Sequence, residues 1–522
     1  MTAKLRIDGQ DVTAHPGDTV LAAARRAGVE IPTFCHDENL PPGSSCMVCV
    51  VRDEASGRLF PSCSAPAEEG MSVDTKSETV LEARRTAVEL LLCEHAGDCE
   101  APCRRACPAH MDIPEMIRRI EGGEMEAAAD IVFGHIVLPA VLGRICPAPC
   151  EKACRRALHD EAVSICLLKQ RVGDAALRGA PRLRAGEDTG RRAAVVGAGP
   201  AGLAAVAELR RQGHAVTLFD AGQSPGGALR TAIPEERLPR EVLDAEIEAI
   251  LSLKVDLRSG TEVGRHIPWQ EVFDAFDAVI IASGGSSLEG LSGTGVEITE
   301  RGVRTEARTL ATSRQGIFAA GNAVAKKRLA VRALAHGRRA AVSAGQFLAG
   351  GAVAGDVRRF DSFLGRLDEN ETKNWALDAS REARRSPAAG QTQGFSETEA
   401  LREAGRCMAC DCADKHDCRL RQTAEALGAD KRAFRARRRN GALRNREHPR
   451  LVYEAGKCIR CGLCVRLSEA LDEPLGLAFL GRGSALRVAP PFGRSLAEAV
   501  TKDPLRYADL CPTGALMKKR GL

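Results

Sequence analysis

Twenty cysteines constrain this 522-residue chain more than any other feature, because they are numerous and gathered in three groups. Four lie between residues 35 and 63, eight between 93 and 166, and eight between 407 and 511. In a reducing compartment such a number indicates metal centres rather than disulfides. The number of cysteines in each group is also a multiple of four, and four thiolates bind one iron-sulfur cluster when all its ligands are cysteine.

The compartment follows from the rest of the composition. The start MTAKLRIDGQ lacks the apolar core of a signal peptide, and the chain has no run of about 18 apolar residues. We therefore expect a cytoplasmic protein without a membrane span. The net charge of +5 is small for this length and gives no reason to expect nucleic acid as a partner.

The hydrophobic patterns and turn signals along the chain predict a multidomain protein of mixed α/β and α+β class. In residues 1–80 we expect a hairpin (LRIDGQDVTA), a helix (DTVLAAARRAG) and a strand pair (MVCVVRDEASGRLFPSC), which suit a small β-grasp domain. Helical periodicity dominates residues 81–180, whereas strands and helices alternate over 191–350, as in a parallel sheet with crossover helices. Residues 351–395 are expected to form a linker before a last cysteine-rich domain at 396–522.

The first cysteine group has the spacing C-x10-C-x2-C-x13-C, formed by Cys35, Cys46, Cys49 and Cys63. Thiolates suit iron because they bind it while staying deprotonated. The spacing resembles the [2Fe-2S] domain at the start of the large iron-sulfur subunit of respiratory complex I, and of related hydrogenases and formate dehydrogenases. The resemblance implies a [2Fe-2S] ferredoxin domain, and a structural zinc site is the alternative.

The second cysteine group lies in the phrases CRRACPAHMDIPEMI and GRICPAPCEKAC and in the residues around them. These phrases resemble the helical N-terminal domain of the glutamate synthase small subunit and of dihydropyrimidine dehydrogenase, which holds two [4Fe-4S] clusters with interleaved ligands. The resemblance implies one cluster on Cys93, Cys99, Cys103 and Cys154, and another on Cys107, Cys146, Cys150 and Cys166. Two positions stay open. The family has Gln or Glu at Cys166, which leaves a buried core thiol as the alternative, and His95 lies close enough to replace Cys93.

A dinucleotide-binding fingerprint begins the third region. Gly197, Gly199 and Gly202 form G-x-G-x-x-G between an apolar strand and an alanine-rich helix, in VVGAGPAGLAAVAEL. Such glycines let the backbone approach a pyrophosphate at the helix N-terminus, and Asp220, at the end of the next strand, is placed to bind ribose hydroxyls. The strand, the helix and the acid together predict a bound dinucleotide.

Two further phrases favour FAD over NAD. PGGALRTAIPEERLP and GIFAAGNAVA resemble flavin-contacting segments of the glutamate synthase family. The resemblance adds Gly226, Gly227, Gly321 and Asn322 to the expected cofactor-binding residues. Asn322 stands where the family usually has Asp, and it can still hydrogen-bond as a neutral group.

The same family normally inserts a second nucleotide-binding domain between the segments that here read FDAVIIASGG and GIFAAGN. Only about 30 residues separate them, whereas a domain of this kind needs on the order of 100. We therefore expect the NAD(P)H domain to be missing.

The third cysteine group contains C-x2-C-x2-C at Cys458, Cys461 and Cys464, as in bacterial ferredoxins. Ser468 occupies the position where a fourth cysteine would serve a second cluster, so Cys511 in CPTGAL is expected to complete a single [4Fe-4S] cluster. Upstream, Cys407, Cys410, Cys412 and Cys418 lie in CMACDCADKHDC, which resembles a cluster segment of complex I and formate dehydrogenase. It implies a fifth cluster, with zinc as the alternative and His416 as a substitute ligand.

A basic stretch at 431–450 holds nine Lys or Arg against one Glu. It would suit an acidic partner subunit, although such runs are more often simply solvated.

All of these parts move electrons, and we find no catalytic nucleophile or acid-base constellation. The expected cofactors are FAD, one [2Fe-2S] cluster and three or four [4Fe-4S] clusters. We predict an electron-transfer subunit that links a partner dehydrogenase, hydrogenase or reductase to ferredoxin-like carriers. The alternatives are a self-contained NAD(P)H-dependent reductase of the glutamate synthase type, and an iron-sulfur or zinc scaffold without redox turnover.

Overall fold

The computed structural model describes residues 2–180, 182–285, 288, 290–325, 329–434 and 441–519, so residues 435–440 of the basic stretch lie outside the described residues. The chain forms two compact units. Unit 1 comprises Met1–Ala101, Arg359–Leu377 and Cys410–Leu522, and unit 2 comprises Pro102–Arg358 and Asp378–Ala409. The chain therefore passes between the units four times, because most of unit 2 is inserted after Ala101.

Unit 1 begins with a five-stranded mixed sheet of order β2-β1-β5-β3-β4. Its strands are β1 (Ala3–Ile7), β2 (Gln10–Ala14), β3 (Val50–Asp53), β4 (Leu59–Pro61) and β5 (Ser72–Asp74). The pairs β1–β2 and β3–β4 are antiparallel, and β1 pairs with β5 in parallel. The hairpin, the helix (α1, Val20–Arg26) and the strand pair predicted from the sequence are confirmed.

A long helix, α2 (Glu78–Glu94), carries the chain away from this sheet. Its residues Val80, Arg84, Val88 and Leu92 recur every fourth position, and all are buried on one helical face. The Arg84 Nε donates to the carbonyl of Val50 at 3.0 Å, which attaches α2 to β3.

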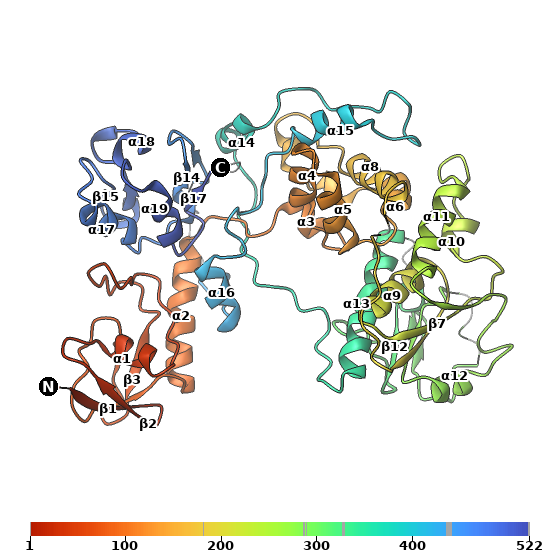
Figure 1. Ribbon diagram of the computed structural model, residues 1–522, viewed down its shortest axis with the longest axis horizontal. Coiled ribbons are helices and arrows are strands. Elements are labelled where there is room, and N and C mark those ends of the chain that lie inside the picture. The colour runs from red at the N-terminus through yellow and green to blue at the C-terminus, as the bar shows by residue number, and fades with distance from the viewer. Residues whose placement is uncertain are drawn as a thin grey trace. The chain divides into compact units, whose positions relative to one another are not determined.

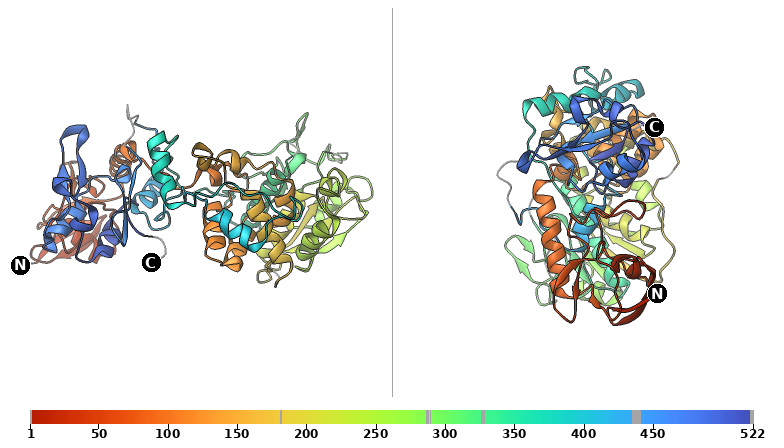
Figure 2. Two further views of the ribbon diagram at one scale, coloured as in Figure 1. Left: turned by 90° about the horizontal axis from the view of Figure 1, so that it is seen from above. Right: turned by 90° about the vertical axis from the view of Figure 1, so that its left-hand side faces the viewer.

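The C-terminal part of unit 1 is built from short elements. They are β13 (Arg444–Asn445), β14 (Leu451–Glu454), β15 (Ala478–Leu480), β16 (Arg487–Ala489) and β17 (Leu516–Lys518), with α16 (Arg419–Ala426), α17 (Leu463–Ala470), α18 (Leu496–Ala499) and α19 (Pro504–Leu510). Strands β13, β14 and β17 form one antiparallel sheet, and β15 pairs with β16. This part lies beside the N-terminal sheet, as the blue and dark red ribbons of Figures 1 and 2 show, and Arg466 donates to the Cys35 carbonyl at 2.8 Å.

The segment predicted as a linker, 351–395, contains α14 (Glu369–Trp375). Asp368 and Glu371 form a capping box at its N-terminus. Trp375 is buried, and Arg444 stacks over its ring with the guanidinium 3.7 Å from the ring centroid. The segment therefore adds an ordered helix to the core of unit 1.

Unit 2 begins with α3 (Pro102–Ala106), α4 (Ile113–Glu121), α5 (Met125–Phe133), α6 (Pro139–Ile145), α7 (Pro149–Lys152) and α8 (Ile165–Leu177). Helix α4 illustrates why this sequence is helical: the Asp112 side chain caps its N-terminus, and Ile113, Met116, Ile117 and Ile120 bury one face. The predicted helical region is confirmed. The returning helix α15 (Glu397–Ala404) packs against α4 and α8.

A five-stranded sheet of order β12-β9-β6-β7-β8, parallel throughout, forms the rest of unit 2. The strands are β6 (Arg192–Val196), β7 (Ala215–Phe219), β8 (Asp256–Arg258), β9 (Ala278–Ile281) and β12 (Ile317–Ala319), and the helices are α9 (Pro200–Arg211), α10 (Ala228–Thr231), α11 (Arg240–Leu251), α12 (Trp269–Ala275) and α13 (Ala330–Leu348). All four residues of β9 are buried, as expected when helices cover both faces of a parallel sheet. The predicted parallel sheet with crossover helices is confirmed (Figure 1).

In the part of the chain that the structure describes, no helix combines the length and the apolar character needed to cross a bilayer.

Candidate redox centres

The fingerprint glycines of unit 2 form a tight strand-to-helix turn. Gly197 has φ of +109°, and a Cβ there would lie 2.5 Å from the carbonyl oxygen of Ala282. A Cβ at Gly202 would lie 1.7 Å from the carbonyl oxygen of Gly197. Gly199 is the N-cap residue of α9, so the helix N-terminus faces the space left by these glycines.

The other predicted cofactor residues gather at this turn. The Asp220 carboxylate, at the end of β7, accepts hydrogen bonds from the amides of Ala198 and, at 2.8 Å, Gly222. The amide of Gly226 donates to Ala198 at 2.9 Å, and a Cβ at Gly227 would lie 2.9 Å from the Cα of Gly199. This crowding needs glycine and holds the PGG segment against the fingerprint loop.

A cavity of about 180 Å³ continues this site along α13. It is lined by Gly321, Asn322, Ala325, Arg332, Ala333 and His336. Gly321 and Asn322 were predicted, but Arg332 and His336 were not. Their i, i+4 spacing in the helix after GIFAAGN places both on one face, and this signal was available in the sequence.

The four N-terminal thiols, Cys35, Cys46, Cys49 and Cys63, are buried together. Cys35 is hydrogen-bonded to Cys46 and Cys63, and these bonds lower its pKa strongly. A bond from Cys63 likewise lowers the pKa of Cys49 to about 6. The structure therefore links all four residues of the predicted [2Fe-2S] set by thiol contacts, in the order Cys46, Cys35, Cys63 and Cys49.

The four C-terminal thiols line one small cavity. Cys458, Cys461, Cys464 and Cys511 face it, and the apolar side chains of Leu463 and Val488 enclose it. Burial raises the pKa of Cys458 to about 11 and that of Cys461 to about 12, so a metal that binds there displaces protons. This enclosed donor set of four sulfurs fits a [4Fe-4S] cluster.

Ser468 does not face that cavity. Its hydroxyl donates to the Cys464 carbonyl at 3.0 Å, accepts from the Leu477 amide at 3.0 Å, and contacts the Tyr507 hydroxyl. The Ser468 hydroxyl therefore stabilises helix α17 and its neighbours and does not point toward the four thiols.

In unit 2, the predicted set Cys107, Cys146, Cys150 and Cys166 surrounds a buried cation. Cys166 is hydrogen-bonded to Cys146 and Cys150. The Lys169 Nζ lies 3.9 Å from the Cys166 Sγ, and the four thiols raise the pKa of this lysine although burial opposes its charge. Sequence reasoning missed Lys169, which its i, i+3 position after Cys166 on α8 would have indicated.

A further set forms in unit 1 from residues far apart in the chain. The Cys412 amide donates to the Cys99 carbonyl at 3.3 Å, and the Cys99 Sγ accepts from the Ser362 amide at 3.4 Å. Cys418 is close enough for Cys412 and Cys99 to raise its pKa, after burial as the main cause. His95 is buried nearby, and its Nδ1 is 3.0 Å from the carbonyl oxygen of Lys457. We call His95, Cys99, Cys412 and Cys418 the split set.

Lys457 is the buried cation of this region. Its Nζ lies 3.4 Å from the Cys412 Sγ and 2.9 Å from the Glu454 carboxylate, and its side chain is 3% exposed. Glu454 also pairs with Arg444 at 3.1 Å. In the sequence, Lys457 stands next to Cys458, and nothing there indicated its contact with Cys412.

Cys103, Cys154 and Cys407 are half-buried and pack against the core of unit 2, and Cys99 belongs to unit 1. The predicted grouping of Cys103 and Cys154 with Cys93 and Cys99, and of Cys407 with Cys410, Cys412 and Cys418, stays a prediction. Cys93 is half-buried at the end of α2, and His416 is exposed. Among the described residues, no three His, Cys, Asp or Glu side chains converge on the position of a single metal ion.

Three family profiles match the chain. Residues 2–78 match a 2Fe-2S iron-sulfur cluster binding domain, residues 68–180 match domain II of dihydropyrimidine dehydrogenase with its 4Fe-4S cluster, and residues 195–254 match an NAD(P)-binding Rossmann-like domain. The predicted iron-sulfur oxidoreductase with a dinucleotide-binding fold is confirmed at the level of these domains.

Three curated relatives each match part of the chain. The chain is 39% identical over 218 residues to the NADP(+)-dependent formate dehydrogenase subunit beta of Moorella thermoacetica, covering 37% of this chain and 31% of that protein. It is 36% identical over 220 residues (42% and 52%) to the NAD-dependent dihydropyrimidine dehydrogenase subunit PreT of Escherichia coli O157:H7. It is 33% identical over 198 residues (36% and 40%) to the glutamate synthase [NADPH] small chain of Bacillus subtilis. The matches span between about a third and a half of these relatives.

Proposed function

We propose that this chain is an electron-transfer subunit of a larger oxidoreductase, in which FAD exchanges electrons in pairs and iron-sulfur clusters carry them singly. The partner is another redox subunit, a dehydrogenase, hydrogenase or reductase, with ferredoxin-like carriers at the other end. Similarity to subunits of formate and dihydropyrimidine dehydrogenases supports this reading.

The observation that carries the proposal is the contact between neighbouring cysteine sets in unit 1. The loop after Cys511 touches the split set, because the Cys418 Sγ donates to the Pro512 carbonyl at 3.8 Å and the Thr513 hydroxyl donates to the Lys457 carbonyl at 3.1 Å. Arg466, two residues after Cys464 on α17, donates to the Cys35 carbonyl at 2.8 Å, and Cys35 and Cys418 belong to one buried cluster against which Cys461 packs. The three sets of unit 1 thus lie close together, as a relay requires.

The contacts also support a revised assignment of ligands. We assign the split set to one [4Fe-4S] cluster, with the Nε2 of His95 as its fourth ligand while Nδ1 is held by the Lys457 carbonyl. Cys407 and Cys410 have the C-x2-C spacing that binds one cluster, and we assign a further [4Fe-4S] cluster to this spacing. The N-terminal, C-terminal and Cys166-containing sets keep their sequence-based assignments, and Cys93 is left outside every cluster.

Iron analysis tests these assignments. Anaerobically purified protein is expected to contain about 18 iron atoms per chain, from one two-iron and four four-iron clusters. Cys93→Ala is expected to leave this content unchanged, whereas Cys412→Ala is expected to lower it by about four. A loss of four iron atoms in Cys93→Ala would restore the original grouping, and iron near zero in the wild type would refute the proposed function.

The C-terminal cluster is expected to depend on Cys511 and not on Ser468. Cys511→Ala removes one of the four sulfurs that line the cavity, so one four-iron cluster should be lost or converted, as iron content and the electron paramagnetic resonance spectrum would reveal. Ser468→Ala removes hydrogen bonds in α17 and should cost about 1 kcal/mol of stability with all clusters present. The opposite pattern would show that the ligand set is wrong.

FAD retention is expected to depend on Asp220. Asp220→Ala removes the expected ribose contact, a hydrogen bond from Ala198 of the fingerprint loop and a hydrogen bond from Gly222 in the turn after β7. Flavin content measured by absorbance should fall while iron content stays constant. Full flavin occupancy in this variant would contradict the assignment of the cofactor to this turn.

A further inference from the structure

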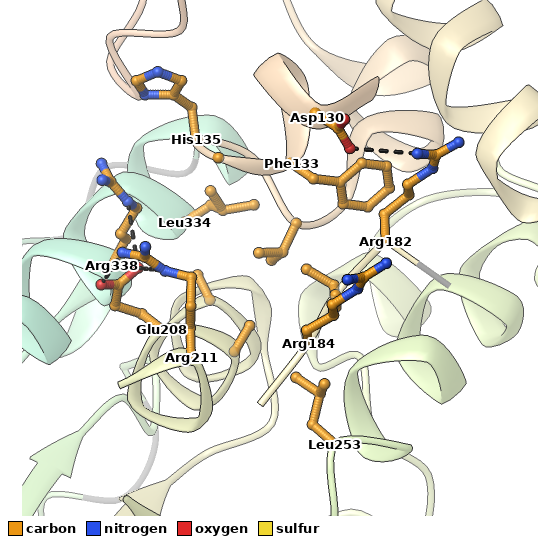
Figure 3. A pocket seen from close by; sticks show the side chains of 15 residues that line it. Asp130, Phe133, His135, Arg182, Arg184, Glu208, Arg211, Leu253, Leu334 and Arg338 are labelled. Atoms are coloured by element: carbon orange, nitrogen blue, oxygen red, sulfur yellow. Dashed lines mark hydrogen bonds and ion pairs between the residues drawn. The ribbon is translucent and has the colours of Figure 1, made fainter. Parts of the chain in front are cut away.

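A cavity of about 210 Å³ in unit 2 lies along the C-terminal half of α9, away from the fingerprint glycines at the N-terminus of that helix. We call it the arginine cavity, after Arg182, Arg184, Arg211 and Arg338 in its lining. Phe133 and Leu334 are among its apolar residues (Figure 3). None of the predicted cofactor or cluster residues lines it.

Two of the arginines are largely buried but only loosely paired. Arg182 is 17% exposed and lies 3.4 Å from Asp130 and 3.2 Å from Glu126, both of which are mostly exposed. Arg338 is 21% exposed and lies 3.6 Å from Glu208 and 3.8 Å from Asp356. The carboxylates beside Arg182 are solvated and compensate its largely buried guanidinium poorly, whereas Arg338 shares the buried Glu208 with Arg211, which binds that carboxylate at 2.6 Å.

Two buried nitrogens at this cavity, the Nε of Arg182 and the Nδ1 of His135, lack a hydrogen-bond partner. The Nε of Arg338 makes only the 3.6 Å contact with the Glu208 carboxylate. Burial and the nearby Arg338 lower the pKa of His135 to about 4, so its ring is neutral at pH 7 and can donate from one nitrogen. Buried donors without acceptors are rare and costly, so the cavity favours a ligand rich in acceptor oxygens.

The arrangement of the lining defines the ligand further. In Figure 3, Arg211 and Arg338 lie on one side and Arg182 and Arg184 on the other, with the apolar side chains between them. The four arginines outnumber the two carboxylates of the lining, Asp130 and Glu208. Guanidinium groups match the paired oxygens of carboxylates and phosphates.

We propose that the arginine cavity binds a small organic dianion, a dicarboxylate or a phosphate monoester, whose apolar body lies on Phe133 and Leu334. The oxygens of this ligand accept from the arginines and from His135. This site is independent of the assignment of clusters and flavin, because it shares no residue with them.

Titration calorimetry of the full chain tests the proposal with four probes. Glutarate and phenyl phosphate represent the two sources of a dianion, butyrate is a monoanion, and 1,5-pentanediol is neutral. At least one dianion is expected to bind at least about tenfold more tightly than butyrate, since one charge-assisted hydrogen bond contributes enough for that factor. The diol is expected not to bind, and which dianion binds identifies the source. Failure of both dianions, or equal binding of butyrate, would overturn the proposal.

Three arginine variants test whether the dianion binds in the arginine cavity. Arg338→Gln and Arg184→Gln are each expected to weaken binding of the better dianion at least about tenfold. Arg258→Gln removes the same charge from an arginine on β8 that is 60% exposed and does not line the cavity, and it should bind as the wild type does. Arg184 is exposed, so its replacement should leave the visible spectrum unchanged. Unaltered affinity in Arg338→Gln and Arg184→Gln would show that the ligand binds elsewhere.

Discussion

Anaerobic mixing of the isolated chain with NADH or NADPH is expected to leave its flavin oxidised, with bleaching slower than about 0.01 s⁻¹, a thousandth of a typical enzymatic rate. Hydride transfer needs the nicotinamide held against the flavin, and binding of the remote nucleotide normally supplies that positioning. Only residues 282–316 lie between β9 and β12, and their described part contains the short strand pair β10 (Ile298–Thr299) and β11 (Gly302–Val303). A nucleotide-binding domain needs on the order of 100 residues.

Dithionite is the matched reagent, because it needs no nucleotide site and is expected to bleach the same flavin fully. The rate of flavin bleaching by each reductant is compared in a stopped-flow instrument on one preparation. Bleaching by dithionite alone shows that the flavin can be reduced and that a nicotinamide-binding site is missing. Rapid bleaching that saturates with NADH or NADPH, in protein free of partner subunits, would favour the self-contained reductase instead.

The second large effect is expected at Lys457. Lys457→Met removes a buried positive charge 3.4 Å from the Cys412 Sγ, which disfavours adding an electron to the adjoining cluster. At an effective dielectric constant of about 20, the lost interaction is of order 3 kcal/mol, or about 130 mV in the midpoint potential of a one-electron couple. A redox titration followed by electron paramagnetic resonance should therefore show one cluster shifted to lower potential and the others nearly unchanged.

Two variants control this result. Lys457→Arg keeps the charge and should keep the potential within a small fraction of that shift, even if Lys457→Met folds poorly because Glu454 loses a partner. Lys373→Met changes an exposed lysine on α14, whose partner Glu369 is also exposed, and should shift no cluster. A potential unchanged in Lys457→Met would show that this lysine does not tune a cluster held by the split set.

Local patterns predicted the parts of this molecule that local chemistry determines. The fingerprint turn at Gly197–Gly202 and the hairpin of β1 and β2 depend on residues close in sequence, so their spacing was sufficient. The same holds for the four N-terminal thiols, which lie within one small sheet domain.

Long-range pairing explains what the sequence could not predict. Cys99 precedes Cys103 by four residues, and the sequence groups them in one cluster, whereas the backbone amide of Cys412, more than 300 residues away, donates to the Cys99 carbonyl at 3.3 Å. Spacing cannot reveal an insertion that separates two halves of a site. The buried lysines were missed for a similar reason, because Lys457 meets the thiol of Cys412 through the fold rather than through its neighbour Cys458.

The insertion of unit 2 within unit 1 has a consequence for biosynthesis. Beside the split set, Glu100 and Arg421 form a buried ion pair at 2.7 Å although 321 residues separate them. At about 5 to 20 residues per second, the ribosome delivers the second half of this region roughly 15 to 60 s after the first. The segment with His95 and Cys99 is therefore synthesised before the dinucleotide-binding part of unit 2, and its partners Cys412 and Cys418 are synthesised only after that part. Under the proposed assignment, the cluster of the split set can mature only after everything encoded between His95 and Cys418 has been made.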